Sequence, residues 1–199
     1  PAQVFEGTHG FFNGFGGKNE YRYEKLLELG QSWEIPKLAF KSYPCGSISH
    51  PYMDCALRIK QKYAPAPEAI AEVVCRTAEG PVHRLWEPLA DKQKPLSSYG
   101  AKFSLPYSLA VMLVYGRAGL DEFTDAAIQD PDVLKLAGKI RCVLGPTIDY
   151  PRHLSGRVKV GMADGESFEE SHPHPRGGLE EPLAPAEVED KFRANARLA

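Results

Sequence analysis

Apolar and polar residues recur along the chain in patterns that predict both helices and strands. In residues 49–62, Met53, Ala56 and Leu57 follow the three- and four-residue spacing of an amphipathic helix. The apolar run from Leu109 to Tyr115 predicts a buried helix beginning near Pro106, because proline is tolerated in the first helical turn. Further helices are expected over residues 21–29, 120–128, 132–140 and 186–198.

Strands are predicted where apolar and β-branched residues cluster between turn residues. They cover residues 33–41, 70–78 and 141–144, followed by a hairpin over 156–170 that turns at Asp164-Gly165. Strands and helices do not alternate strictly along the chain. We therefore expect an α+β fold with two layers, an antiparallel or mixed sheet with helices on one face.

Two segments are rich in glycine. Residues 1–17 combine glycine with phenylalanine and are expected to form a loop, and residues 173–185 form a proline- and glycine-rich linker before the final helix. The chain begins at Pro1 without a methionine, and we expect it to be a piece of a longer polypeptide or to pair with one.

Charge and composition exclude several classes of protein. The 199 residues carry a formal net charge of −2, so no basic excess favours nucleic acid or an anionic membrane. No apolar run reaches the roughly 18 residues that span a bilayer, and no signal peptide is recognisable. The four cysteines are widely spaced, which favours reduced thiols and a cytoplasmic protein.

Two residues in the segment KSYPCGSISH (41–50) are candidates for chemistry. Lys41 lies beside a predicted turn, where its ammonium could hold a substrate carboxylate, although a solvated lysine is the common alternative. His50 begins a predicted helix, where it could transfer protons near neutral pH or simply belong to the core.

The segment AKFSLPY (101–107) supplies three more candidates. The phenol of Tyr107 could donate a hydrogen bond to an oxygen that gains charge, or it could be a buried aromatic with a satisfied hydroxyl. Lys102 is a candidate second carboxylate ligand or a surface charge, and Ser104 is a candidate substrate ligand or helix cap.

Other reactive residue types suggest weaker hypotheses. No histidine or aspartate pattern activates Cys45 as a nucleophile. His172 and His174 flank a proline without other ligands nearby, so we expect no metal. The glycine-rich segment lacks a dinucleotide-binding motif, and we expect no cofactor.

The order of these segments resembles the carboxyl-terminal half of the MmgE/PrpD family. The match rests on EG at 6–7 and GF at 10–11, on KSYPC followed by His50, on AKFSLPY, and on the closing helix with Lys191-Phe192. The resemblance implies an α+β lid domain over residues 33–172, with residues 1–32 and 173–199 belonging to a helical domain. It also implies that Lys41 and Tyr107 are active-site residues. Gly46 stands where some members, decarboxylases among them, have a histidine.

The resemblance implies a cofactor-independent lyase that removes a proton α to a carboxylate of a small di- or tricarboxylate. Dehydration of a compound such as 2-methylcitrate is the first expectation, and epimerisation or decarboxylation is the alternative within the family. The remaining active-site residues would lie in a helical amino-terminal domain of the same protein. We also expect a homodimer, because a half without that domain would expose the apolar face that the helices normally cover. A second hypothesis is that the chain is a non-catalytic half that binds its partner domain. A third hypothesis is an unrelated metal hydrolase.

Overall fold

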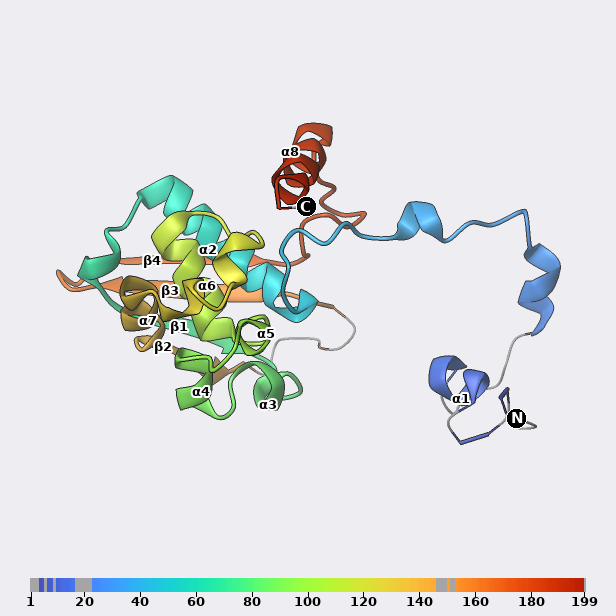
Figure 1. The fold of residues 1–199 in the computed structure, drawn as a ribbon, viewed down its shortest axis with the longest axis horizontal. Coiled ribbons are helices and arrows are strands. Elements are labelled where there is room, and N and C mark those ends of the chain that lie inside the picture. The colour runs from blue at the N-terminus through green and yellow to red at the C-terminus, as the bar shows by residue number, and fades with distance from the viewer. Residues whose placement is uncertain are drawn as a thin grey trace. The chain divides into compact units, whose positions relative to one another are not determined.

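The computed structural model describes residues 4–145, 150 and 153–198, apart from 6, 9 and 17–22. It consists of two compact units, Pro1–Leu38 and Ala39–Ala199 (Figure 1). Each unit is described by itself below.

The first unit contains short helical segments. They are α1 (Phe11–Gly16) and the 3₁₀ helices η1 (Tyr23–Glu28) and η2 (Ile35–Lys37). The helix predicted over 21–29 is therefore a 3₁₀ helix in its described part, followed by Gly30 at a φ of +82°. Phe11 contacts Phe15, with ring centroids 4.9 Å apart, so the phenylalanines of this segment pack on one another.

The strand predicted over residues 33–41 is wrong. This described stretch contains the single turn η2 and no strand. Pro36 lacks the N–H that a sheet would need, and the alternating apolar residues find no sheet on which to pack. Trp33, Leu38 and Phe40 are accordingly exposed.

The second unit is built on a mixed four-stranded sheet in the order β2-β1-β3-β4. The strands are β1 (Ile70–Thr77), β2 (Ile140–Leu144), β3 (Gly156–Met162) and β4 (Ser167–His172). β1 pairs with β2 in parallel and with β3 in antiparallel fashion, and β3 pairs with β4 in antiparallel fashion. The predicted α+β class and mixed sheet are confirmed.

The predicted hairpin is also confirmed. Gly165 has a φ of +94°, a conformation that favours glycine, and the Asp164 carboxylate accepts a hydrogen bond of 3.0 Å from the Glu166 amide. The Asp-Gly pair therefore sets the turn between β3 and β4.

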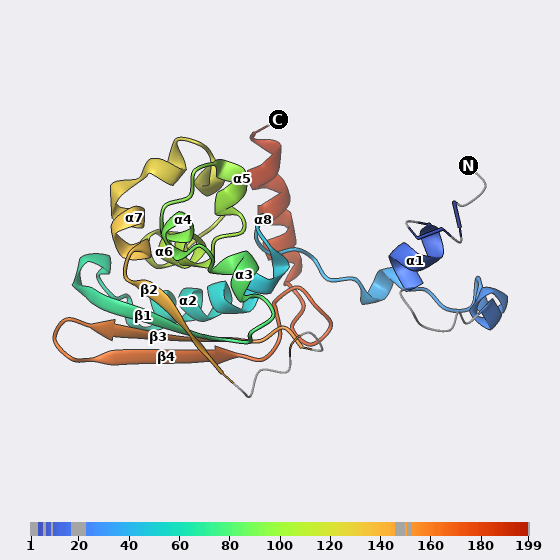
Figure 2. The same cartoon turned by 90° about the horizontal axis from the view of Figure 1, so that it is seen from below.

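Helices cover one face of this sheet (Figure 2). Along β3, Val158 and Val160 are buried beneath the helices, whereas Arg157 and Lys159 are exposed on the opposite face. This strict alternation is what a sheet with one covered face requires. The helix α2 (His50–Tyr63) packs against β3, β4 and the helix α6 (Leu105–Tyr115).

The first residue of β3 lies very close to α2. A Cβ atom on Gly156 would lie 2.5 Å from the carbonyl carbon of Pro51. Only glycine leaves room for this approach, which brings the sheet edge against the start of α2.

The helix α6 is the centre of the core. Every residue from Leu105 to Leu113 is buried, as its apolar run predicts. The Ser104 hydroxyl caps the helix by accepting from the Tyr107 amide at 3.0 Å, and Pro106 lies in the first turn. Gly116, with a φ of +67°, ends the helix.

Short helical segments complete the second unit. They are α3 (Val82–Leu85), α4 (Leu89–Gln93), α5 (Ser98–Ala101), α7 (Pro131–Ala137), α8 (Pro185–Ala196), and the 3₁₀ turns η3 (Ser47–Ser49), η4 (Pro67–Ala69), η5 (Asp121–Phe123) and η6 (Ala127–Gln129). The single helix predicted over 120–128 is wrong, because the extended Thr124 separates η5 from η6. None of the helices in the described part is long and apolar enough to cross a membrane.

Candidate active site

The two predicted segments lie side by side. The amide of Gly46 donates a hydrogen bond of 2.8 Å to the carbonyl of Lys102. A Cβ atom on Gly46 would lie 3.7 Å from the ring of Phe103. The segments 41–50 and 101–107 are therefore in direct contact, although the sequence separates them by about fifty residues.

Lys41 is exposed at the start of the first segment. Its carbonyl oxygen accepts a hydrogen bond from the Nζ of Lys191. Within the described part of the chain, no carboxylate forms an ion pair with the ammonium of Lys41. The geometry thus leaves this charge available to an anion.

His50 is the first residue of α2 and only 3% of its surface is exposed. Its Nε2 is buried and has no hydrogen-bond partner among the described residues. Burial lowers its pKa to about 4, and the nearby charges of Lys41 and Lys191 lower it further, whereas Asp54 acts in the opposite direction. His50 is therefore neutral at pH 7.

Tyr107 is buried within the second unit. Its hydroxyl donates a hydrogen bond of 2.7 Å to the carbonyl of Glu122, and its ring packs edge-on against Phe123. Burial raises the pKa of Tyr107, so the phenol keeps its proton. The structure gives this hydroxyl a partner inside the core and does not direct it at Lys41.

Ser104 and Lys102 have different environments. The hydroxyl of Ser104 is fully buried, accepts from the Tyr107 amide and donates to the carbonyl of Lys92, so both of its roles are internal. Lys102 is half-buried and contacts the first segment through its carbonyl. Its ammonium makes no ion pair with the residues that the structure describes.

Cys45 lies within the first segment and is buried, and its thiol is not activated. Burial raises its pKa to about 12, so the thiolate needed for nucleophilic attack does not form at neutral pH. Its sulfur lies 3.4 Å from that of Met53, in the core beside α2.

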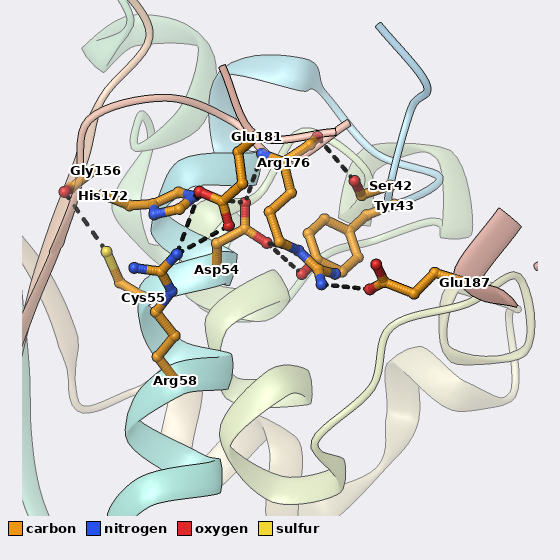
Figure 3. Close-up of polar contacts among 10 residues, drawn as sticks. All are labelled: Ser42, Tyr43, Asp54, Cys55, Arg58, Gly156, His172, Arg176, Glu181 and Glu187. Carbon is orange, nitrogen blue, oxygen red and sulfur yellow. Dashed lines mark hydrogen bonds and ion pairs between the residues drawn. The ribbon is translucent and has the colours of Figure 1, made fainter. Parts of the chain in front are cut away.

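Sequence reasoning missed a buried network of charged residues around Asp54 (Figure 3). The Tyr43 hydroxyl donates to Asp54 Oδ1 at 2.6 Å, and Nε of Arg176 approaches the same oxygen at 3.2 Å. Nε2 of His172 lies 3.5 Å from Asp54 Oδ2 and 3.3 Å from Glu181 Oε2. The sequence offered one signal of this network. Asp54 is an acidic residue on the otherwise apolar face of a helix, and a carboxylate in that position requires a hydrogen-bonding or charged partner when it is buried.

The network ties the linker after β4 to the first segment. Arg176 also pairs with Glu187 at 2.7 Å, and its carbonyl accepts a hydrogen bond of 3.0 Å from the Ser42 hydroxyl. Arg58 pairs with Glu181 at 2.9 Å. Residues 173–185, predicted as a linker, are thereby attached to α2 and to residues next to Lys41.

His172 belongs to this network through its contacts with Asp54 and Glu181. Burial, with a further contribution from Arg58, holds its pKa below the usual value, so the ring is neutral at pH 7. In the described ranges, no group of three or more histidine, cysteine, aspartate or glutamate side chains is arranged to hold a metal ion.

A cavity of about 470 Å³ lies next to the first segment. Ser42 and Tyr43 line one side, the loop after α6 lines a second, and α8 lines a third. Its charged lining residues are Arg117, Arg176, Lys191, Arg197, Asp121, Glu122 and Asp190. The volume lies in the range of pockets for small organic molecules.

The profile of the MmgE/PrpD C-terminal domain matches residues 43–199. The chain belongs to the MmgE/PrpD family. The match begins two residues after Lys41 and covers AKFSLPY, α8 and the residues that line the cavity except Ser42.

Curated members of the MmgE/PrpD family are similar to nearly the whole chain. The cis-aconitate decarboxylase-like protein oryM of Aspergillus oryzae is 28% identical over 96% of this chain and 42% of its own length. The cis-aconitate decarboxylase of Aspergillus terreus is 27% identical over 94% of this chain and 39% of its own. The 2-methylcitrate dehydratase of Cupriavidus necator is 27% identical over 85% of this chain and 36% of its own length.

These relatives are named as decarboxylases and dehydratases, which are both lyases. The chain spans about two fifths of the length of the first relatives that it matches, and it corresponds to their carboxyl-terminal part. The chain therefore corresponds to only a part of each of these relatives.

Proposed function

We propose that this chain is the lid portion of a cofactor-independent lyase that acts on a small di- or tricarboxylate. The observation that carries the proposal is the ammonium of Lys41, which lacks an acidic partner among the described residues and precedes the residues that line the cavity. Family membership supports it, because the curated relatives are lyases.

The difficult step is removal of the proton α to a carboxylate, since the resulting anion is high in energy. Fixed positive charge and hydrogen-bond donors lower this barrier when they lie where charge develops. In the proposal, Lys41 binds a substrate carboxylate and Lys102 assists it. The Tyr107 hydroxyl donates to an oxygen that gains charge, after leaving the Glu122 carbonyl, and His50 orients substrate or relays a proton.

Dehydration of a substrate such as 2-methylcitrate is the reaction that we propose first. In that reaction, the proton leaves one carbon and hydroxide leaves the neighbouring carbon, so a double bond and water form. The base would come from a helical amino-terminal portion, and Ser104 would act through the α6 cap. Gly46 lacks an ionisable side chain next to Lys102, which disfavours decarboxylation as the first choice.

The proposal is tested in a polypeptide that joins this chain to a helical amino-terminal portion. Incubation with 2-methylcitrate and with cis-aconitate, followed by product analysis, distinguishes dehydration from decarboxylation. Lys41→Met should lower kcat/KM at least about a hundredfold, because the charge that holds the carboxylate is removed. Lys159→Met, on the open face of the sheet, is the matched control. Wild-type rates in the Lys41 variant would refute the role.

A non-catalytic binding module is the second candidate. The observation in its favour is a run of exposed apolar side chains in the first unit, namely Trp33, Ile35 and Leu38. Exposed apolar residues at this density are typical of surfaces that bind another protein part. Mixing the chain with a separately produced amino-terminal portion decides between the candidates: restored lyase activity supports the enzyme, and association without activity supports the module.

A further inference from the structure

Lys191 of α8 lies against the first segment. Its Nζ donates a hydrogen bond to the carbonyl of Lys41, 150 residues away in the sequence. The side chain is half-buried and forms no ion pair with a carboxylate of the described residues. A lysine that is partly buried without a counter-charge is unusual, because burial disfavours the ammonium.

The network around Asp54 holds α8 in this place. Arg176 joins the buried carboxylate of Asp54 to Glu187 in the first turn of α8, with a distance of 2.7 Å to Glu187 Oε1 (Figure 3). Glu187 in turn accepts a hydrogen bond of 2.9 Å from the amide of Ala184, which caps the helix. Lys191 lies one turn later, so its position is set by contacts that begin in the core.

One face of α8 lines the cavity. Lys191, Ala194 and Asn195 recur at helical spacing and contribute to the lining, with Asp190 beside them and Leu198 just beyond the end of the helix. The small side chain of Ala194 leaves space one turn beyond Lys191.

The local charges favour a bound anion near Lys191. Of the cavity residues, Arg117 pairs with Glu122, and Arg176 pairs with Asp54 and Glu187. Lys191 instead contacts Lys41, through the hydrogen bond to its carbonyl, and no ion pair joins it to the lining residue Asp190 within the described part of the chain. Burial, followed by repulsion from Lys41, lowers the pKa of Lys191, and no carboxylate offsets these effects.

The neutral ring of His50 lies within the field of the same two lysines. Its Nε2 is buried and lacks a partner among the described residues. Two ammonium groups near each other are unfavourable unless an anion lies between them. A carboxylate satisfies both, because each of its oxygens accepts hydrogen bonds from an ammonium.

We propose that Lys191 is a second anion-binding residue, which holds one carboxylate of an organic acid together with Lys41 at the mouth of the cavity. That this acid is the substrate rests on the proposed function. The anion site itself rests on the contacts of Lys191 and Lys41 alone. In this arrangement, the final helix of the chain contributes directly to ligand binding.

The test measures binding without turnover. Tricarballylate, a tricarboxylate without a hydroxyl group to eliminate, is titrated into the 199-residue chain by calorimetry. Lys191→Gln keeps a hydrogen-bond donor for the Lys41 carbonyl and removes the charge. It should weaken binding about tenfold, while Lys191→Arg should stay within about threefold of the wild type and Lys159→Met should bind as the wild type does.

Two results would overturn the proposal: no binding of tricarballylate to the wild-type chain, or equal affinity of the wild type and Lys191→Gln. The ε-carbon resonances of Lys41 and Lys191 provide an independent readout, since both should shift together during the titration. If binding depends on Lys191 but the joined polypeptide shows no lyase activity, the anion site stands and the proposed function fails.

Discussion

The hydroxyl of Tyr43 donates a 2.6 Å hydrogen bond to Oδ1 of Asp54, and both side chains are buried. The same carboxylate faces Arg176 and His172, which come from the other end of the chain. One aspartate on α2 thus connects the segment that carries Lys41 with the segment that carries α8.

Asp54→Ala should lower the free energy of unfolding by about 3 to 5 kcal/mol. The substitution leaves the guanidinium of Arg176 partly buried without its main partner, which costs more than an exposed ion pair contributes. Urea denaturation of the chain measures the loss. Glu72→Ala, which breaks the exposed pair with Arg141, is the control and should cost less than about 1 kcal/mol. Equal losses in the two variants would contradict the importance of the network.

His50 should make stability depend on pH between about 4 and 6.5. Its pKa in the folded chain is about 4, below the ordinary value, so the unfolded state binds the proton more readily in this range. The stabilisation is complete above pH 6.5 and is lost as the pH falls toward 4. It amounts to about 3 kcal/mol at most.

Unfolding curves of the wild type and His50→Gln across that range isolate the effect. The wild type should lose more stability on acidification than the variant, because the variant has no proton to bind at this position. Parallel pH profiles would show that His50 is not buried in its neutral form.

Gly177→Ala should destabilise the chain far more than Gly165→Ala. Both glycines have positive φ, +93° and +94°, but a Cβ on Gly177 would lie 2.2 Å from the carbonyl oxygen of Phe40, whereas Gly165 faces open space. The left-handed conformation costs about 1 to 2 kcal/mol in either variant, and the clash adds to it at Gly177. Thermal denaturation of the two variants measures the difference. Similar midpoint temperatures would exclude the close approach of Gly177 to the Phe40 carbonyl.

Tyr107→Phe separates the structural from the catalytic role of this residue. Loss of the hydrogen bond to the Glu122 carbonyl should cost about 1 to 2 kcal/mol of stability. If the hydroxyl also donates to the substrate, kcat/KM of the joined polypeptide should fall about a hundredfold at a temperature where the variant is folded. An unchanged kcat/KM with reduced stability would restrict Tyr107 to the core.

Local signals predicted the regular elements well. Ser104 and Pro106 mark the start of α6, and Asp130 with Pro131 marks the start of α7, because a cap and a first-turn proline act within a few residues. The Asp164-Gly165 turn sets the β3–β4 hairpin for the same reason.

Predictions failed where distant residues decide the outcome. Residues 33–41 alternate like a strand but meet no partner strand, which their own sequence cannot reveal. The partner of Asp54 is Arg176, 122 residues away in a segment that reads as a flexible linker. The hydrogen bond of Lys191 to Lys41 joins residues that are 150 positions apart, so this part of the site emerges only in three dimensions.

The position of β1 inside the sheet has a consequence for biosynthesis. This strand leaves the ribosome before β2 and β3, yet Val73 pairs with Ile140 on one side and with Val160 on the other. The backbone hydrogen-bonding groups on both edges of β1 stay unpaired until more than sixty further residues have been synthesised. Pairing between residues so far apart in the sequence slows folding and leaves the strand exposed until its partners are made. Nascent chains that stop before β2 should therefore be the ones that chaperones capture most strongly.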